Sequence, residues 1–137
     1  MEVIIYTNEN GNVSVCVPTG ELPIEQVQIK DTPPGSIIVD SETLPNAYND
    51  FFDAWELNDG VVVVNLTKAK AIGHGIRRAA RAEEFKPHDE VIMKQIPGND
   101  YTQAEAARQA IREKYEEIQT QIDAAQTPEE IKTALGI

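Results

Sequence analysis

The hydrophobic pattern of the sequence changes period near residue 66, and this change limits the possible folds more than any other feature. Before it, short runs of β-branched residues lie between turn residues; after it, apolar residues recur every three or four positions. A period of two is typical of strands, and a period of 3.6 is typical of helices. The sequence therefore predicts an α+β protein, with an antiparallel β-rich lobe at 1–66 and a helical lobe at 67–137.

Two turn signals predict hairpins in the first lobe. Asn10-Gly11 and Asp59-Gly60 each separate two β-rich runs. Such pairs favour tight hairpins because both residues tolerate a positive φ. Strands are expected at about 3–6, 13–17, 36–39, 53–57 and 61–66.

Two other segments of the first lobe carry weaker patterns. Residues 24–30 have apolar positions that fit neither period, so a short helix and a further strand both stay open. The unbroken run Val61-Val62-Val63-Val64 predicts a strand covered on both faces, since it shows no alternation. We expect the covering element to come from the second half of the chain.

The second lobe contains two or three main helices, bounded by turn and capping residues. Thr67 or Asn65 can cap the first, and Pro87 permits a new helix that Pro97-Gly98 would end. Thr102 and Glu105 form a capping-box pattern, in which each side chain bonds to the other residue's amide. Thr127-Pro128 is a second capping pattern, in which Thr127 is the cap and proline occupies the first helical position. The expected helices run from 67 to about 85, from 88 to 96 and from 102 to about 125, followed by a terminal turn or two that carries Ile131 and Leu135.

The charge of the chain is distributed unevenly. The formal net charge is −11 and the isoelectric point is near 4.5, which argues against a nucleic-acid-binding protein because neutralising phosphates needs a basic surface. Residues 1–66 hold eleven acidic residues and one basic residue, a net charge of −10. Residues 67–137 hold twelve acidic and eleven basic residues, a net charge of −1.

The sequence offers few groups for catalysis or metal binding. His74 and His88 fall in different expected helices, Cys16 falls in a strand, and no common zinc-ligand spacing occurs. His88 and Asp89 could join a distant carboxylate, but solvated residues near a helix start are the simpler interpretation. No phosphate-binding glycine loop or nucleophile motif is present. We therefore predict no enzyme, no cofactor and no metal.

Location can also be predicted from the sequence. No run approaches the roughly 18 apolar residues that cross a bilayer, and the start MEVIIYTNENG lacks the basic region of a signal peptide. One cysteine cannot form an internal disulfide. We expect the chain to be made and folded in a cytoplasm, with no membrane partner.

The stretch KAKAIGHGIRRAAR at 68–81 carries five basic side chains. The simplest interpretation is the solvated face of an amphipathic helix. A sharper one is that Arg77, Arg78 and Arg81 bind carboxylates, since guanidinium groups pair with them in a bidentate manner. The acidic half could supply these carboxylates within the chain or from a neighbouring copy. Phosphate contact is a third interpretation, which the surrounding negative charge disfavours.

Two glycines in the same stretch weaken a helix. Gly73 and Gly75 each cost roughly 1 kcal/mol relative to alanine, so we expect another segment to approach the backbone closely there. The longest expected helix carries an apolar stripe that includes Ile111, Ile118 and Ile122. The spacing of this stripe suits either a core face or a seam between copies of the chain.

Several segments resemble a family of small proteins of tailed bacteriophages. The resemblance lies in MEVIIYTNENGNVSV, DTPPGSIIVDSETLP and FFDAWEL in the first half. In the second half, LTKAKAIGHGIRRAARAEEF, HDEVIMKQI and TPEEIKTALGI resemble the helical module of phage tail-fibre and tail-fibre-assembly proteins. These are packing and turn motifs, and they bring no catalytic residue with them.

The resemblance implies a non-enzymatic structural part of a phage particle, of tail, fibre, neck or baseplate type. Such a protein would be in the host cytoplasm during assembly and in the virion afterwards, docked on other phage structural proteins and on copies of itself. Arg77, Arg78 and Arg81 would bind carboxylates, and Ile111, Ile118 and Ile122 would form an apolar seam. Two alternatives are a tail-fibre assembly chaperone absent from the virion, and a small acidic regulator or inhibitor of a host protein.

Overall fold

The chain folds into two compact units, Met1–Ala69 and Lys70–Ile137. The structure is a computed structural model that describes residues 1–94 and 101–137. Antiparallel strands lie in the N-terminal part and the C-terminal part is helical, so the predicted α+β class is confirmed. We call Met1–Ala69 the β unit and Lys70–Ile137 the helical unit.

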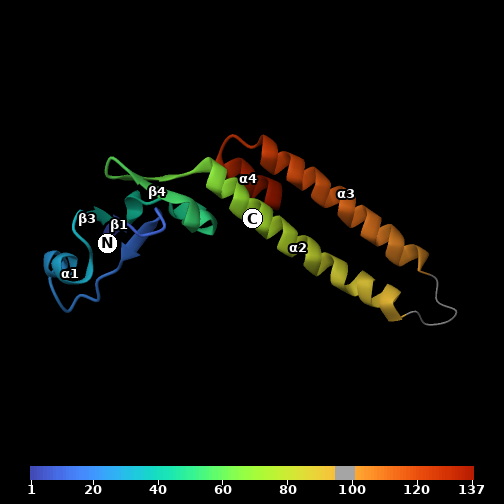
Figure 1. Cartoon of the computed structure of the whole chain (residues 1–137), viewed down its shortest axis with the longest axis horizontal. Coiled ribbons are helices and arrows are strands. Elements are labelled where there is room, and N and C mark those ends of the chain that lie inside the picture. The colour runs from blue at the N-terminus through green and yellow to red at the C-terminus, as the bar shows by residue number, and fades with distance from the viewer. Residues whose placement is uncertain (95–100) are drawn as a thin grey trace. The chain divides into compact units, whose positions relative to one another are not determined.

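A three-stranded antiparallel sheet forms one layer of the β unit (Figure 1). Its strands are β1 (Glu2–Thr7), β2 (Val13–Cys16) and β3 (Ile37–Asp40), in the order β2-β1-β3. The turn between β1 and β2 contains Asn10-Gly11 as predicted, but only Gly11 has a positive φ, of 79°. The Asn8 side chain closes this turn by accepting from the amides of Asn10 and Asn12.

A second, two-stranded sheet is formed by β4 (Trp55–Asn58) and β5 (Val61–Val64). Asp59 and Gly60 both have positive φ, of 50° and 80°, so this hairpin has the tight turn that the sequence predicted. Two short 3₁₀ helices, η1 (Ser41–Thr43) and η2 (Asn46–Ala54), connect the two sheets. Because η2 occupies 46–54, β4 starts two residues later than the expected strand.

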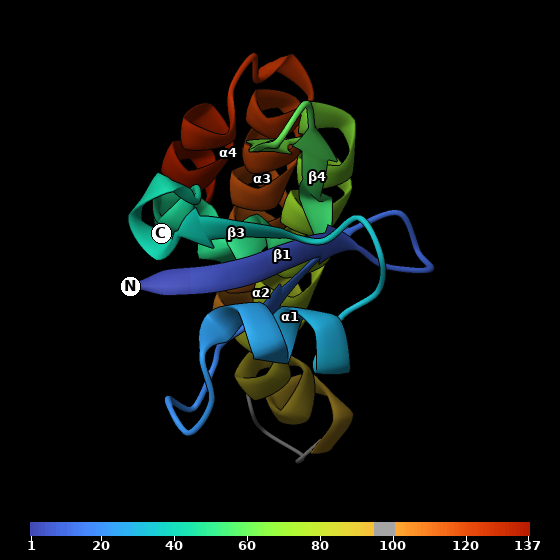
Figure 2. The same cartoon turned by 90° about the vertical axis from the view of Figure 1, so that its left-hand side faces the viewer.

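The core of the β unit lies between the two sheets. Val3, Ile5 and Val13 of the first sheet pack with Trp55 and Val62 of the second. Residues 24–30, for which the sequence left a helix and a strand open, form the helix α1 (Ile24–Asp31). In Figure 2, α1 and β4 lie on opposite sides of β1, so the first sheet is covered on both faces.

The prediction for the valine run is wrong. Val62 is 8% exposed, whereas Val61 and Val63 are 58% and 40% exposed. The strand alternates in burial because only one face of this two-stranded sheet contacts the core. Because all four residues are valine, the sequence of this strand shows no alternation. The alternation in burial comes from the different surroundings of its two faces.

The helical unit is built from α2 (Leu66–Lys94), α3 (Thr102–Ala124) and α4 (Pro128–Leu135). Three contacts show that α2 and α3 run antiparallel, since higher residue numbers on α2 meet lower ones on α3. The contacts are His74 with Asp123, Glu84 with Lys114, and Asp89 with Arg108. Figure 1 shows the two helices side by side, with α4 packed beside them.

The predicted helix break at Pro87 is wrong, because α2 continues through this proline to Lys94. Proline disrupts a helix interior by removing one hydrogen bond and crowding the preceding turn, but the contacts with α3 on both sides of Pro87 hold the helix together. The expected stop at Pro97-Gly98 lies outside the described residues.

The helix starts follow the predictions only in part. The Asn65 side chain accepts from the Lys68 amide and caps α2. Thr127 accepts from the Glu130 amide, with Pro128 at the first turn of α4, as predicted. The capping box at Thr102 is wrong, because Tyr101 is the N-cap residue of α3 and Thr102 is already helical.

Candidate docking site in the helical unit

Four arginines line one groove between α2 and α3. Arg77, Arg78 and Arg81 come from α2, and Arg112 comes from α3. The groove has a volume of about 490 Å³, and its wall on α3 also includes Tyr115, Glu116 and Gln119. We call this site the arginine groove.

Among the described residues, none of the four groove arginines forms an ion pair. Arg77 donates to His74, and Arg112 donates to the Gln109 side-chain oxygen at 3.1 Å. Arg81 lies 4.7 Å from the centre of the Phe85 ring. Four guanidinium groups without carboxylate partners are unexpected in a chain with a net charge of −11.

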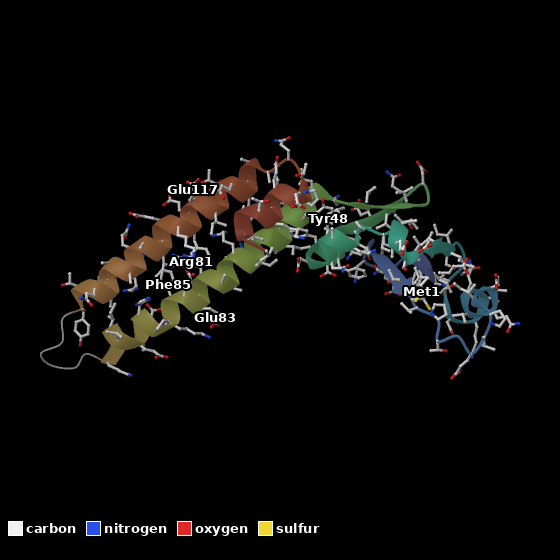
Figure 3. The ribbon with its side chains drawn as sticks, turned by 180° about the vertical axis from the view of Figure 1, so that it is seen from behind. Met1, Tyr48, Arg81, Glu83, Phe85 and Glu117 are labelled. Carbon is white, nitrogen blue, oxygen red and sulfur yellow. The ribbon has the colours of Figure 1, made fainter. Side chains whose placement is uncertain are left out.

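A second hollow adjoins the groove around Phe85. It shares Arg81 and Arg112 with the arginine groove and adds Arg108. Three guanidinium groups lie within 5.9 Å of the Phe85 ring centre, and this ring is 8% exposed. Figure 3 shows Arg81 and Phe85 between the two helices. Of these three arginines, only Arg108 forms ion pairs with described residues, with Asp89 at 3.0 Å and with Glu105 at 2.9 Å.

His74 contacts Arg77, one of the groove arginines, and Asp123 of α3. Its Nε2 lies 2.8 Å from Oδ1 of Asp123, and its Nδ1 accepts from Nε of Arg77 at 3.3 Å. Because Nδ1 accepts, the ring hydrogen is on Nε2, which donates to Asp123. The histidine therefore positions Arg77 and links α2 to α3, where Lys70 also donates to the Asp123 backbone oxygen.

The close approach expected at the two glycines occurs at Gly73 and comes from within the helical unit. A Cβ atom at Gly73 would lie 2.8 Å from Cγ2 of Ile131 in α4 and 3.8 Å from two carbons of Ile122. At Gly75 a Cβ atom would meet nothing within 4 Å. Gly73 therefore allows α4 to pack against the α2 backbone, and Gly75 has no such role.

The three isoleucines of the expected seam have different environments. Ile122 is fully buried against Gly73, so it belongs to the core of the helical unit and cannot contact a partner. Ile111 and Ile118 are half-buried. Ile111 lines a shallow hollow with Glu84, Pro87 and Lys114. The seam is therefore interrupted, and its exposed part is smaller than the sequence suggested.

The ion pair between Glu84 and Lys114 shifts the pKa values of both groups. Lys114 donates to Glu84 at 2.8 Å and holds the pKa of that carboxyl below its usual 4.5. The same bond raises the pKa of Lys114 above 10.5. Burial raises the pKa of the Tyr115 phenol above 10.0, and its contact with Glu84 adds to this shift.

Other site types find little support in the described residues. Residues 1–94 and 101–137 contain no cluster of three histidine, cysteine or carboxylate residues that could hold a metal ion, and Asp89 binds Arg108 instead of joining His88. Within the same ranges, no helix has both the length and the apolar character needed to cross a membrane. Comparison with protein-family models, with curated proteins and with solved structures gave no match.

The structure adds two residues to the site that sequence reasoning missed. Arg112 and Tyr115 of α3 complete the groove opposite the three predicted arginines. Their positions depend on the rotation of α3 against α2, which the sequence does not give. One signal was available, since all five arginines of the chain fall between residues 77 and 112.

Proposed function

We propose that this chain is a non-enzymatic docking protein and a structural component of a tailed bacteriophage particle, attached to its neighbours through the arginine groove. One observation carries the docking role: four arginines from two helices line a single groove, and none of them has an ion-pair partner among the described residues.

The chemistry of the groove favours carboxylates as its ligand. Guanidinium groups bind carboxylates through two parallel hydrogen bonds, and neighbouring guanidinium groups repel one another until an anion lies between them. A nucleic acid is a poorer candidate, because the acidic remainder of the chain repels a phosphate backbone over a longer range. We therefore expect an acidic protein surface in the groove.

The assignment to a phage particle rests on the sequence resemblance. The motifs MEVIIYTNENGNVSV and DTPPGSIIVDSETLP lie in the β unit, and LTKAKAIGHGIRRAARAEEF begins just before the helical unit and contains three of the groove arginines. An arginine groove on a helical hairpin suits such a role, since a docking protein needs an exposed, rigid and charged surface more than a reactive group.

The phage role is tested by mass spectrometry of purified virions from the phage that encodes the chain. A constant copy number per particle supports a permanent structural part. Absence from the virion, combined with recovery on immature tail fibres, would instead identify an assembly chaperone. Recovery on a basic host protein in a salt-sensitive complex would identify the regulator.

The docking role is tested by changing one arginine on each wall of the groove. The variant Arg78→Glu/Arg112→Glu should lose incorporation into particles, because two anion-binding groups become repulsive. The matched control, Lys86→Glu/Lys94→Glu, makes the same change in net charge elsewhere on α2 and should be incorporated normally. Equal incorporation of both variants, with folding confirmed by circular dichroism, would exclude the groove as the docking site.

A further inference from the structure

The charges of the two units are complementary. The β unit holds eleven acidic and two basic residues, a net charge of −9. Within the described residues, only Asp40 and Glu56 among these carboxylates form ion pairs. The chain therefore carries carboxylates without cations on one unit and guanidinium groups without carboxylates on the other.

One part of the β unit combines this charge with an exposed aromatic ring. On η2, the exposed residues Asp50 and Asp53 flank Phe52, which is 39% exposed. The Phe52 ring centre lies 4.9 Å from that of the buried Trp55, so a core residue supports the phenyl ring. Neither aspartate has an ion pair in the described structure. We call Asp50, Phe52 and Asp53 the η2 patch.

We infer that the arginine groove binds the η2 patch of a second copy of this chain. This inference rests on the proposed docking function and names the partner of the same site. The Asp50 and Asp53 carboxylates supply the anions that the groove lacks, and guanidinium groups also stack on aromatic faces such as that of Phe52. Arginine is one of the residue types enriched among those that dominate binding energy, and the groove supplies four of them.

The geometry of this contact has a consequence for assembly. The groove and the η2 patch are different surfaces, so each copy can offer one and receive the other. Contacts of this head-to-tail kind form a closed ring when the rotation between copies closes, and an open chain when it does not. Self-association should therefore end in a closed ring, of which a reciprocal pair is the smallest, or continue as an open chain.

The inference is tested by sedimentation of the full chain over a range of protein concentrations. The wild type should increase in mass with concentration. The variants Asp50→Lys/Asp53→Lys and Arg78→Glu/Arg112→Glu should each associate at least about tenfold more weakly, because each turns attractive pairs into repulsive ones. The control Lys86→Glu/Lys94→Glu should associate like the wild type.

Mixing the two defective variants gives the sharpest test. The first retains an intact groove and the second an intact η2 patch, so an equimolar mixture should associate at concentrations at which either variant alone is monomeric. A chain with all four substitutions should associate again, because lysines then face glutamates. A mixture that stays monomeric while the wild type associates would overturn the inference, as would a wild type that is monomeric at every concentration.

Failure of this inference can be separated from failure of the docking function. A fluorescent hexaglutamate peptide and a single-stranded oligonucleotide are titrated into the wild type and into Arg78→Glu/Arg112→Glu. If the wild type is monomeric but binds the peptide through the groove, the second copy is excluded and docking on another acidic protein stands. Binding of neither ligand in a monomeric wild type would exclude both, and groove binding of the oligonucleotide alone would identify a phosphate site.

Discussion

The β unit and the helical unit bury their cores in opposite ways. In the β unit, large side chains such as Trp55 and Ile5 fill the interior. In the helical unit, the close contact between α2 and α4 depends on the missing side chain of Gly73, against which Ile131 packs. The stability of the β unit should therefore fall most when a buried side chain is shortened. The stability of the helical unit should fall most when atoms are added at Gly73.

The units also differ in how they use charge. Most carboxylates of the β unit face solvent without a partner, whereas ion pairs such as Glu84–Lys114 and Asp89–Arg108 connect α2 to α3. Charge in the helical unit thus contributes to its own packing through these pairs, while the four groove arginines have no ion pair among the described residues. In the β unit, only Asp40 and Glu56 form ion pairs among the described residues.

The largest expected effect is truncation of Phe51 in the β unit. Phe51→Ala should lower the free energy of unfolding by about 3–5 kcal/mol, since it removes a fully buried ring and leaves a cavity. Trp55, the single tryptophan of the chain, reports on unfolding of this unit in urea. The neighbouring substitution Phe52→Ala is the control, and its effect should be much smaller because Phe52 is exposed. Equal effects would contradict the assigned core.

The two glycines of α2 should respond to alanine with opposite signs. Gly73→Ala should destabilise the helical unit, because overpacking costs about 1–3 kcal/mol and a better helix propensity offsets about 1 kcal/mol of this. Gly75→Ala, where a Cβ atom meets open space, should stabilise by about 1 kcal/mol. Thermal unfolding followed at 222 nm measures both.

A rescue experiment identifies the cause of the Gly73 effect. Ile131→Leu removes the methyl group on Cβ that lies closest to Gly73. This substitution should recover part of the stability that Gly73→Ala loses. If the two substitutions were additive, contact with α4 would not be the reason for the glycine.

Removing the cap of α2 should have an intermediate effect. Asn65→Ala should cost about 1 kcal/mol, since the Lys68 amide at the helix start loses its side-chain acceptor. Asn65→Ser retains an acceptor and should recover most of this loss. Urea unfolding of both variants is compared with that of Thr127→Ala, which removes the corresponding cap of α4. An unchanged stability of Asn65→Ala would show that the Asn65 side chain does not stabilise the start of α2.

The smallest expected effect is the pH dependence of the pair between Glu84 and Lys114. Because the pKa of Glu84 is lowered in the folded state, its contribution to folding stability is complete above pH 4.5. This contribution is lost as the pH falls through the folded-state pKa. The magnitude should stay below about 1 kcal/mol, because both side chains are more than one-third exposed. Glu84→Gln should weaken this acid dependence in unfolding experiments between pH 3 and 7.

At alkaline pH the dependence of stability on pH has the opposite sign. Both Lys114 and Tyr115 have raised pKa values, so their contributions are complete below about pH 10 and are lost as the pH rises further. Tyr115→Phe removes the phenol and should weaken the alkaline loss of stability, and it should also reduce the acid limb, because the phenol is one of the groups that lower the pKa of Glu84. An unchanged alkaline limb would contradict the burial of the phenol.

Local chemistry made part of this fold predictable. The Asp59-Gly60 hairpin and the Thr127 cap were placed correctly, because each depends on residues that are adjacent in sequence. Pro87 and the Val61–Val64 run were misjudged for the opposite reason. Contacts with α3 keep α2 helical through Pro87, and the absence of contacts on one face leaves Val61 and Val63 exposed.

The candidate site was predictable only on one of its walls. Arg77, Arg78 and Arg81 stand out in the sequence because they fall in one helical segment. Arg112 and Tyr115 did not stand out, since they lie on another helix and join the groove only through the packing of α3 on α2. Ile122 had the periodicity of a seam residue, and burial against Gly73 assigns it to the core.

Pro87 has a consequence for the cooperativity of α2. A proline has no amide hydrogen, so the Glu83 carbonyl lacks the donor that residue 87 of a regular helix would supply. Each lost bond lowers the coupling between the turns on either side of it. We therefore expect the amides of residues 88–94 to exchange with deuterium as a separate, faster group, while the amides around Gly73 exchange with the global unfolding of the helical unit.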